Sequence, residues 1–407
     1  MAASIAFAAD TPLAPTPPMG WNSWDSYGTT VTEAEVKANA DAMAAKLKSH
    51  GWRYIVVDIQ WSDAQAKAHG YRPNAELTMD DQGRLTPAVN RFPSAAGGKG
   101  FGPLAAYVHG KGLKFGIHIM RGVPRRAAVA AQIADTSSIC RWNSDMYGVD
   151  MSKPGGQEYY DSIVKLYAEW GVDYIKADDM AIPFHGAEIE ALHKAIVKSG
   201  RPIVLSLSPG PADITKADFY AANANLWRVS GDLWDRWQDV LKTFGLMDKW
   251  SRYSKPGGWP DADMLPLGHI GLRAERGNDR SSLLTHDEQR TLITLWCIAR
   301  SPLMMGGDLP TSDDFTYSLL TNDAVLAVDQ KGANAHQVSA SDGQIVWEST
   351  GPKGEKYLAF FNTGDQPVPA RFDRKLSKPR DLWTGRPAEA GMMIPAHGAR
   401  LIGGRAN

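Results

Sequence analysis

The sequence has few cysteines, no excess of charge of either sign and no long apolar run, and each absence excludes a class of protein. Cys140 and Cys297 are the only cysteines among 407 residues, which excludes a disulfide framework. Lysine plus arginine (44) balance aspartate plus glutamate (45), whereas nucleic-acid-binding domains usually carry a basic excess. No apolar run approaches the roughly 20 residues that a membrane-spanning helix needs. We therefore expect neither a nucleic-acid partner nor a membrane partner.

Several catalytic and metal-binding motifs are also missing. The sequence contains no G-x-S-x-G elbow, which excludes the esterase-type α/β-hydrolases. The glycine-rich stretch around Lys99 is not a phosphate-binding loop, because the upstream glycine and the downstream serine or threonine are lacking. The histidines are scattered without H-E-x-x-H spacing, so we predict no metal site.

What the sequence does contain is a regular alternation of strand-like and helix-like segments. Apolar runs typical of strands buried on both faces occupy residues 19–24, 54–58, 114–119, 173–178, 202–208, 225–230, 261–265 and 301–305. Helical periodicity occupies residues 31–49, 157–170, 187–198, 233–250 and 286–299. The alternation predicts a (β/α)8 TIM barrel. A doubly wound open sheet is the alternative, but Gly20 is followed by Trp21 instead of the glycines of a dinucleotide-binding fingerprint.

The two ends of the chain have a different texture. Residues 1–10 read MAASIAFAAD, which resembles the end of a secretory signal peptide without its positive leading region, and a proline-rich stretch follows. We predict that residues 1–16 are residual signal and lead-in, that 17–330 form the barrel, and that the protein is secreted or periplasmic. Residues 331–407 hold short alternating runs between turn residues, which predicts a small antiparallel β-sandwich.

Charged residues recur where the predicted strands end. In a barrel the reactive side chains gather at the carboxyl ends of the strands, and the residues there are Asp58, Lys176, Asp178, Arg228, Asp232 and Asp263. An aspartate after a strand is often only the N-cap of the next helix, which is how we interpret Asp179 and Asp235. Carboxylates from at least four strands at one end of a barrel would repel one another unless a reaction used them.

Two carboxylates beside a cation are the groups that glycoside hydrolysis requires, since one attacks or stabilises the anomeric carbon and the other protonates the leaving oxygen. Lys176 lies two residues before Asp178, so both side chains point the same way on a strand, and the cation keeps Asp178 ionised. Asp232 follows its strand on a loop, where it is free to exchange a proton. Trp24 and Trp61 lie next to strand ends and are placed to wall a sugar subsite.

Several of these segments together resemble glycoside hydrolase family 27, the family of α-galactosidases and α-N-acetylgalactosaminidases. The matching segments are residues 18–24 (PMGWNSW), 174–178 (YIKAD), 228–232 (RVSGD), 257–265 (GGWPDADML), 295–303 and 320–328. The resemblance covers residues 17–330 closely and the β domain more loosely.

The resemblance implies a retaining double displacement on a terminal α-linked sugar, with an oligosaccharide or glycan as the partner and neither metal nor organic cofactor. By matching position, Asp178 is the nucleophile and Asp232 the acid/base. The glycone would be bound by Trp24, Asp58, Lys176, Arg228 and Asp263.

Two departures from the family pattern lie close to the predicted sugar. Where the family has a second aspartate, which normally helps to hold the axial hydroxyl of galactose, this chain has Ile59, and a tyrosine of the family is His118. We expect Gln60, His118 or Arg121 to replace the missing contact, or the enzyme to prefer another sugar; Arg121 could instead pair with a structural carboxylate. The cysteine that usually follows the nucleophile is Met180 here.

A third departure bears on the choice of sugar. After the fifth strand, Ser208 and Gly210 replace bulky residues that distinguish the sugars the family takes, and the space they leave slightly favours a sugar other than galactose. The hypotheses are therefore an α-galactosidase, a relative that cleaves α-N-acetylgalactosamine, β-L-arabinopyranose or an α-glucan end, or a non-catalytic carbohydrate-binding protein on the same fold. The sequence gives no indication of the oligomeric state.

Overall fold

The computed structural model describes residues 12–370 and 376–406. Residues 1–11 of the predicted signal and lead-in segment, and residues 371–375 and 407 of the predicted β domain, lie outside the described residues. In the described part of the chain, no helix is both long and apolar enough to span a membrane.

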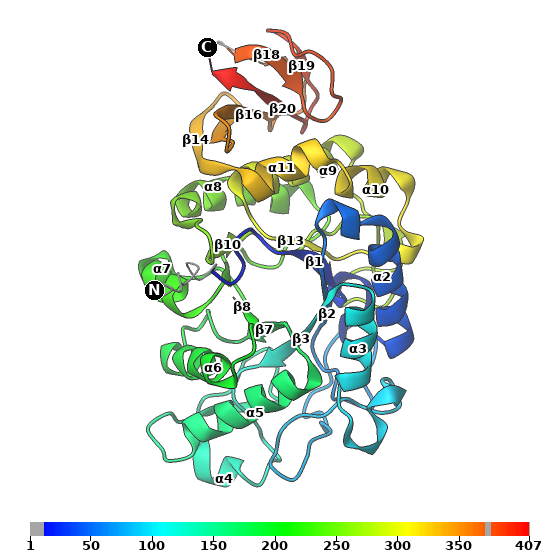
Figure 1. Cartoon of the computed structure of the whole chain (residues 1–407), viewed down its shortest axis with the longest axis vertical. Coiled ribbons are helices and arrows are strands. Elements are labelled where there is room, and N and C mark those ends of the chain that lie inside the picture. The colour runs from blue at the N-terminus through cyan, green and yellow to red at the C-terminus, as the bar shows by residue number, and fades with distance from the viewer. Residues whose placement is uncertain (1–11, 371–375, 407) are drawn as a thin grey trace, which may run out of the picture.

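The central feature is a closed parallel barrel. Within the described residues its strands are β1 (Met19–Asn22), β2 (Tyr54–Val57), β3 (Lys114–Met120), β7 (Tyr174–Asp178), β8 (Val204–Leu207), β9 (Leu226–Arg228), β10 (Trp259–Asp261) and β13 (Leu303–Met305). Hydrogen bonds join them in the order β10-β9-β8-β7-β3-β2-β1-β13. A parallel bridge from Leu265 to Met305 joins the two ends of the sheet. The prediction of a TIM barrel is confirmed (Figure 1).

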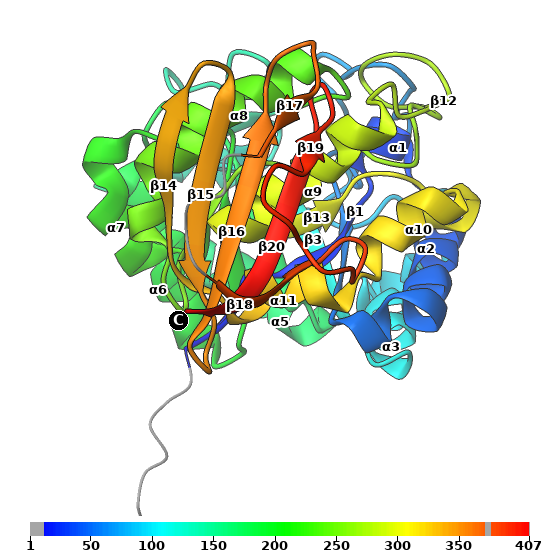
Figure 2. The same cartoon turned by 90° about the horizontal axis from the view of Figure 1, so that it is seen from above.

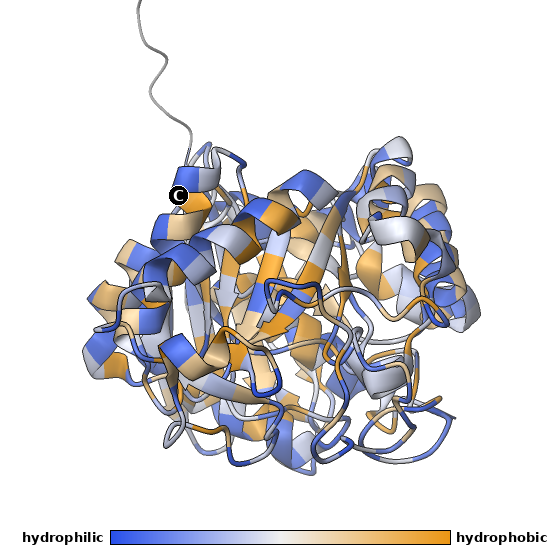
Figure 3. Ribbon diagram, turned by 90° about the horizontal axis from the view of Figure 1, so that it is seen from below, coloured by the Kyte–Doolittle hydropathy of each residue, from blue (hydrophilic) through white to orange (hydrophobic). Residues whose placement is uncertain are grey.

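The barrel strands follow the predicted runs because their side chains are buried both inside the barrel and beneath the helices. Figure 3 shows apolar residues concentrated on these strands and hydrophilic residues on the surrounding helices. One run is displaced: β10 ends at Asp261, and the predicted run 261–265 lies mostly beyond it. The strand stops because the backbone turns at Asp263, which has a φ of 97°.

The helices form a ring outside the barrel (Figure 1). They are α1 (Trp24–Tyr27), α2 (Glu33–Lys46), α3 (Gly102–Gly110), α4 (Ala130–Ile133), α5 (Gly156–Trp170), α6 (Gly186–Ser199), α7 (Ala217–Asn223), α8 (Trp237–Trp250), α9 (His286–Ala299), α10 (Asp314–Leu320) and α11 (Asp323–Lys331). The predicted helix at 233–250 begins only at Trp237, because the chain before it folds toward the carboxyl ends of the strands: the amide of Leu233 donates to Asp263.

Short strands decorate the loops. β4 (Val123–Pro124), β5 (Ala134–Asp135) and β6 (Met146–Val149) form a small antiparallel sheet between β3 and α5, and β11 (His269–Ile270) pairs with β12 (Arg280–Ser281). These loops and the long segment between β2 and α3 build up the rim of the barrel around the carboxyl ends of its strands.

The C-terminal part is an antiparallel sheet that lies on the barrel helices (Figure 2). Its order is β14-β15-β16-β20-β18, and β17 pairs with β19 beside it. The bounds are β14 (Ala333–Ser341), β15 (Gln344–Thr350), β16 (Glu355–Asn362), β17 (Val368–Pro369), β18 (Leu376–Asp381), β19 (Met393–Ile394) and β20 (Ala399–Ala406). One sheet face joins the main core, with Trp347 and Phe361 fully buried, and the other packs with Ile394 into a small second core.

Candidate active site

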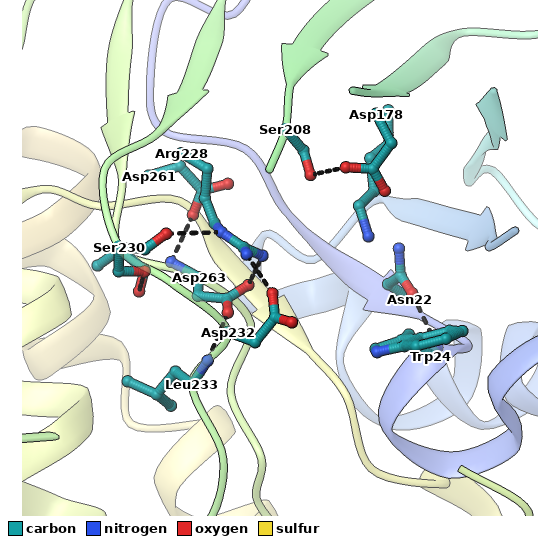
Figure 4. Close-up of polar contacts among 12 residues, drawn as sticks. Asn22, Trp24, Asp178, Ser208, Arg228, Ser230, Asp232, Leu233, Asp261 and Asp263 are labelled. Atoms are coloured by element: carbon teal, nitrogen blue, oxygen red, sulfur yellow. Dashed lines mark hydrogen bonds and ion pairs between the residues drawn. The ribbon is translucent and has the colours of Figure 1, made fainter. Parts of the chain in front are cut away.

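A cavity of about 320 Å³ opens at the carboxyl ends of the barrel strands. Eight of the predicted site residues line it: Trp24, Asp58, Lys176, Asp178, Ser208, Arg228, Asp232 and Asp263. They come from six strands or the loops that follow them, so only the closed barrel brings them together. Figure 4 shows Asp178, Asp232 and Trp24 arranged around one space.

Asp178 is the last residue of β7, and each oxygen of its carboxylate contacts a side chain from a neighbouring strand. Oδ2 lies 2.8 Å from Nε2 of His118, which is on β3. Oδ1 accepts a hydrogen bond from the hydroxyl of Ser208, which directly follows β8. The carboxylate is therefore held from both sides in one orientation.

The surroundings of Asp178 favour its ionised form. Burial alone would raise the pKa of this carboxyl, but the charge of Lys176 and the hydrogen bonds from His118 and Ser208 outweigh burial and hold the pKa well below its usual range. An unprotonated carboxylate facing a cavity is the form that a nucleophile must have. The arrangement agrees with the prediction from the sequence that Lys176 keeps Asp178 ionised.

Asp58 forms the floor of the same cavity together with Lys176. The Nζ atom of Lys176 lies 2.9 Å from Oδ2 of Asp58, and the Asn22 amide donates to that oxygen at 2.7 Å. The other oxygen accepts from the backbone N–H of Ile59 at 2.8 Å. Burial acts to raise the pKa of Asp58, but the charge of Lys176, the nearby His118 and the hydrogen bond from the Ile59 amide together lower the pKa below its usual value.

A second charged cluster forms the opposite wall (Figure 4). Arg228 donates to Asp263 through Nη1 at 2.6 Å and pairs through Nη2 with Asp232. Asp263 also accepts from the amide of Leu233 at 2.8 Å. Burial raises the pKa of Asp263 despite the nearby Arg228, and the charge of Asp232 adds to the rise. One guanidinium thus serves two carboxylates.

The two proposed catalytic carboxylates differ in depth. The side chain of Asp178 is 10% exposed, whereas that of Asp232 is 47% exposed. Asp178 therefore lies deep in the cavity, and Asp232 lies at its mouth.

His118 and Arg121, both predicted to bind substrate, do not line this cavity. His118 contacts Asp178 from behind and lines a separate small cavity of about 20 Å³ with Ile59 and Gln60. Arg121 is buried and pairs with Asp179 and Glu188, with Nη1 2.6 Å from Oε1 of Glu188. Of the two predictions for Arg121, the structure agrees with the one in which it pairs with structural carboxylates. Its donors face away from the cavity.

Three other interpretations need correction. Asp179 and Asp235 are not helix caps: Asp179 binds Arg121, Asp235 binds Arg280, and α6 and α8 begin after other residues. Trp61 does not wall a subsite, because it is buried against Phe101 and Trp170. Each of these three residues contacts partners that are distant in sequence. The spacing of residues along the chain does not indicate such contacts.

Several cavity residues escaped the sequence analysis: Asp25, Tyr71, Trp142, Trp234, Glu275 and Arg276. Most lie on loops without periodicity, so no pattern marks them. Asp25 directly follows Trp24 just after β1, and this position at a strand end is the sequence feature that could have identified it as a cavity residue. Burial and the charge of Asp263 raise its pKa well above the usual value, and among the described residues its Oδ2 has no hydrogen-bond partner.

The arrangement can hold a sugar between a deep carboxylate and one at the mouth, which suits acid-assisted displacement at an anomeric carbon. Within residues 12–370 and 376–406, no group of three or more histidine, cysteine, aspartate or glutamate side chains is arranged to hold a metal ion.

Comparison with known proteins agrees with this chemistry. The profile of the α-galactosidase A family matches residues 16–331. An α-galactosidase of Cyamopsis tetragonoloba is 32% identical over 361 residues, which cover 87% of this chain and 74% of that protein.

Solved structures resemble the chain over almost its full length. A family 27 β-L-arabinopyranosidase of Geobacillus stearothermophilus, solved as an alanine variant in complex with arabinose, is 48% identical with a TM-score of 0.93 and covers 97% of this chain and 98% of its own. A Bacillus halodurans protein provisionally assigned as an α-N-acetylgalactosaminidase is 43% identical, with a TM-score of 0.85 and coverage of 96% and 97%.

Proposed function

The chain belongs to the α-galactosidase A family, glycoside hydrolase family 27, whose members are retaining glycosidases, and on this premise we propose that it removes terminal β-L-arabinopyranose units from glycosides. The observation that carries the proposal is the 48% identity, over nearly the whole of both chains, to a β-L-arabinopyranosidase. The two carboxylates that line the cavity, Asp178 deep in it and Asp232 at its mouth, support the glycosidase part of the proposal.

The proposed reaction begins at Asp178. Its ionised Oδ atom forms a bond to the anomeric carbon while the bond from that carbon to the leaving oxygen breaks, and Asp232 gives its proton to that oxygen. The depth of the two groups fits these roles, because the leaving group departs toward the mouth, where Asp232 lies. Arg228 then stabilises the negative charge left on Asp232.

The second step reverses the roles at Asp232. Its carboxylate takes a proton from a water molecule, the water oxygen bonds to the anomeric carbon, and the ester to Asp178 breaks. Two inversions give net retention of configuration. The hydrogen bonds from His118 and Ser208, one to each oxygen, hold the carboxylate of Asp178 in one orientation.

The choice of sugar rests on the number of acceptors on the cavity floor. β-L-Arabinopyranose has the ring stereochemistry of α-D-galactopyranose, including the axial hydroxyl, but it lacks the hydroxymethyl group. Asp58 is followed by Ile59, which is 2% exposed and offers no polar atom on its side chain. Ile59 lines the small cavity beside His118 and not the sugar cavity, so no second carboxylate stands beside Asp58 there. The hydroxymethyl group of galactose, which arabinopyranose lacks, would find one acceptor fewer in such a site.

A panel of 4-nitrophenyl glycosides tests the proposal. We expect the kcat/KM of the wild type to be highest for the β-L-arabinopyranoside and lower for the α-D-galactopyranoside and the α-N-acetyl-D-galactosaminide. Ile59→Asp should raise the ratio of galactoside to arabinoside kcat/KM by about tenfold, because a hydrogen bond to a charged group contributes about 1.5–3 kcal/mol. Ile59→Asn is the uncharged control and should move the ratio less.

Other outcomes would replace the proposal. Preference for the galactoside or for the N-acetylgalactosaminide would assign the enzyme to that sugar. An unchanged ratio in Ile59→Asp would remove residue 59 from the discrimination. If the folded protein turned over none of these glycosides and no α-D-glucoside either, the hypothesis of a non-catalytic carbohydrate-binding protein would take the place of the proposal.

A further inference from the structure

The cavity has an orientation that fixes where the rest of the substrate must lie. The nucleophile Asp178 is 10% exposed and the proton donor Asp232 is 47% exposed, so the bond that breaks points toward the opening. The sugar being removed therefore fills the deep part of the cavity. The group attached to it, the aglycone, must lie at the rim.

Trp142 is the large exposed aromatic residue at that rim. It lines the same cavity as Asp232, yet 38% of its surface is open to solvent. A tryptophan that is exposed loses much of the stabilisation that burial in a core gives this side chain. Its exposure therefore favours a role in binding over a role in the core. Trp227, Trp259 and Trp296, by comparison, are fully buried.

The loop that carries Trp142 is anchored on both sides. The thiol of Cys140 is buried and hydrogen-bonds with Asp179, directly after the nucleophile. On the other side, Asp145 accepts from the side-chain amide of Gln60 at 2.7 Å and from the amide of Ala75 at 3.2 Å. The indole is thus presented by a fixed loop, and little conformational entropy would be lost when a ring binds against it.

Aromatic rings continue from Trp142 into the cavity. Trp142 lies 5.5 Å from Tyr71 at 47°, and Tyr71 stacks on Trp24 at 5.6 Å and 20°, all measured between ring centroids. The row runs from the open rim to Trp24, which is buried and lines the sugar cavity. Glu275 and Arg276 line the same cavity and add polar groups at its rim.

We propose that Trp142 is the platform of an aglycone subsite, on which the ring attached to the scissile oxygen stacks, and that Glu275 and Arg276 hydrogen-bond to hydroxyls of that ring. The ligand class is a glycoside whose aglycone is itself a sugar ring or an aromatic ring, because both present an apolar face to an indole. The proposal relies on the proposed function only for which carbon is attacked and on which side the leaving oxygen lies.

The test compares two substrates that share the sugar and differ in the aglycone. β-L-Arabinopyranosyl fluoride has no aglycone ring, whereas a disaccharide with a β-L-arabinopyranosyl non-reducing end has one. We expect Trp142→Ala to lower kcat/KM for the disaccharide about tenfold, mainly through KM, a ratio that corresponds to about 1.4 kcal/mol. The same variant should leave kcat/KM for the fluoride within about twofold, since the fluoride makes no contact at the rim.

Two controls make the result specific. Trp142→Phe keeps a ring and should recover much of the loss on the disaccharide. Ile139→Ala removes a side chain that is 37% exposed, three residues away on the same loop and not part of the cavity wall, and should change neither substrate. Inhibition by free L-arabinose should be the same in all variants, which reports that the deep cavity is intact.

Equal losses of Trp142→Ala on the fluoride and the disaccharide would overturn the proposal, because Trp142 would then act on the sugar through Tyr71 and Trp24. No loss on the disaccharide would overturn it too. If the wild type cleaves galactosyl compounds in place of arabinosyl ones, the same comparison runs with α-galactosyl fluoride and an α-galactosyl disaccharide. Failure of the proposed sugar specificity and failure of the aglycone platform are then separate results.

Discussion

At the scale of single residues, Asp178, the proposed nucleophile, is held by side chains from its two neighbouring strands in the barrel. His118 on β3 and the serine after β8 each contact one oxygen of Asp178, so the strands on both sides of β7 position the same carboxylate. The sequence predicts His118 as a sugar contact and Ser208 as a small residue beside the sugar, and of the two only Ser208 lines the cavity. The structure shows that their hydrogen-bonding groups are directed at Asp178, which gives them a positioning role.

If Asp178 is the nucleophile and Asp232 the acid/base, we expect their alanine variants to give glycosyl azides of opposite anomeric configuration when azide is added. In Asp178→Ala the small anion enters the vacated space and attacks the anomeric carbon directly, so the glycosyl azide formed has inverted configuration. In Asp232→Ala the ester to Asp178 still forms, and azide attacks it from the other side, so the product has retained configuration. Both variants should be nearly inactive without azide on substrates with poor leaving groups.

Proton NMR of the azide products reads the two configurations. Asp178→Asn and Asp232→Asn, which fill the space that the anion needs, are the matched controls and should show little rescue. The same anomer from both alanine variants would contradict the division of roles, and retained configuration from Asp178→Ala would move the nucleophile to another residue.

The positions of site residues were predictable only where a strand end fixed them, and their chemical roles remain predictions. The Lys176 and Asp178 spacing placed both side chains in the cavity, and Asp58, Arg228, Asp232 and Asp263 followed because each comes just at or after a strand. Arg121 lies one residue past β3, where the side-chain alternation of the strand no longer applies, and it turned toward Glu188. Tyr71 and Trp142 lie on long loops whose path no periodicity encodes.

At the scale of elements, α9 is the helix on which the two parts of the molecule meet. It begins with a capping box, in which the Thr285 hydroxyl accepts from the amide of Glu288 at 3.2 Å and the Glu288 carboxylate accepts from the amide of Thr285 at 2.8 Å. The same glutamate contacts Nδ1 of His397, in the C-terminal sheet domain, at 2.7 Å. The start of the helix therefore serves both the barrel and the sheet.

Loss of the Thr285 hydroxyl should weaken this start. We expect Thr285→Ala to lower the free energy of unfolding by about 1 kcal/mol, the typical contribution of an N-cap side chain. Thr285→Ser keeps the hydroxyl and should lose much less. Urea unfolding followed by far-UV circular dichroism measures both, and equal losses in the two variants would mean that the methyl group, and not the cap, matters.

Helices whose apolar residues repeat with a regular helical period were predictable. Short helices, and helix ends that are set by tertiary contacts, were not. The segments of α5, α6 and α9 were found because their apolar stripes repeat over three turns or more. α3 and α7 are short, at nine and seven residues, and offer too few repeats for a pattern. The start of α8 was predicted too early because Leu233 is apolar, yet its amide is engaged by Asp263.

At the scale of the whole molecule, the C-terminal sheet completes the core of the barrel. Phe361 of β16 is fully buried against Phe244 of α8, with ring centroids 4.9 Å apart, and His397 stacks on Trp237 at 4.3 Å. The indole of Trp383 donates to Thr294 of α9 at 2.9 Å. The sequence predicts that one face of the sheet is apolar. It does not predict that α8 and α9 cover this face, because an apolar sheet face can pack against the apolar side of any amphipathic helix.

Neighbouring phenylalanines on β16 test whether the two parts unfold together. We expect Phe361→Ala to cost about 3–5 kcal/mol and to reduce hydrogen-exchange protection in α8 as well as in the sheet. Phe360→Ala is the matched control, because Phe360 lies in the small second core on the other sheet face. It should loosen the sheet and leave α8 protected. Loss of protection confined to the sheet in Phe361→Ala would show that the barrel is stable on its own.

The open mouth beside Asp232 has a consequence for the direction of the reaction. Asp232 is half-exposed there. In the proposed mechanism it hands a proton to the departing group, and by microscopic reversibility it can take a proton from a hydroxyl that arrives by the same route. When acceptor alcohols are abundant, they compete with water for the ester intermediate. We therefore expect glycosyl transfer to added alcohols to compete with hydrolysis, in a proportion that rises with the concentration of the acceptor.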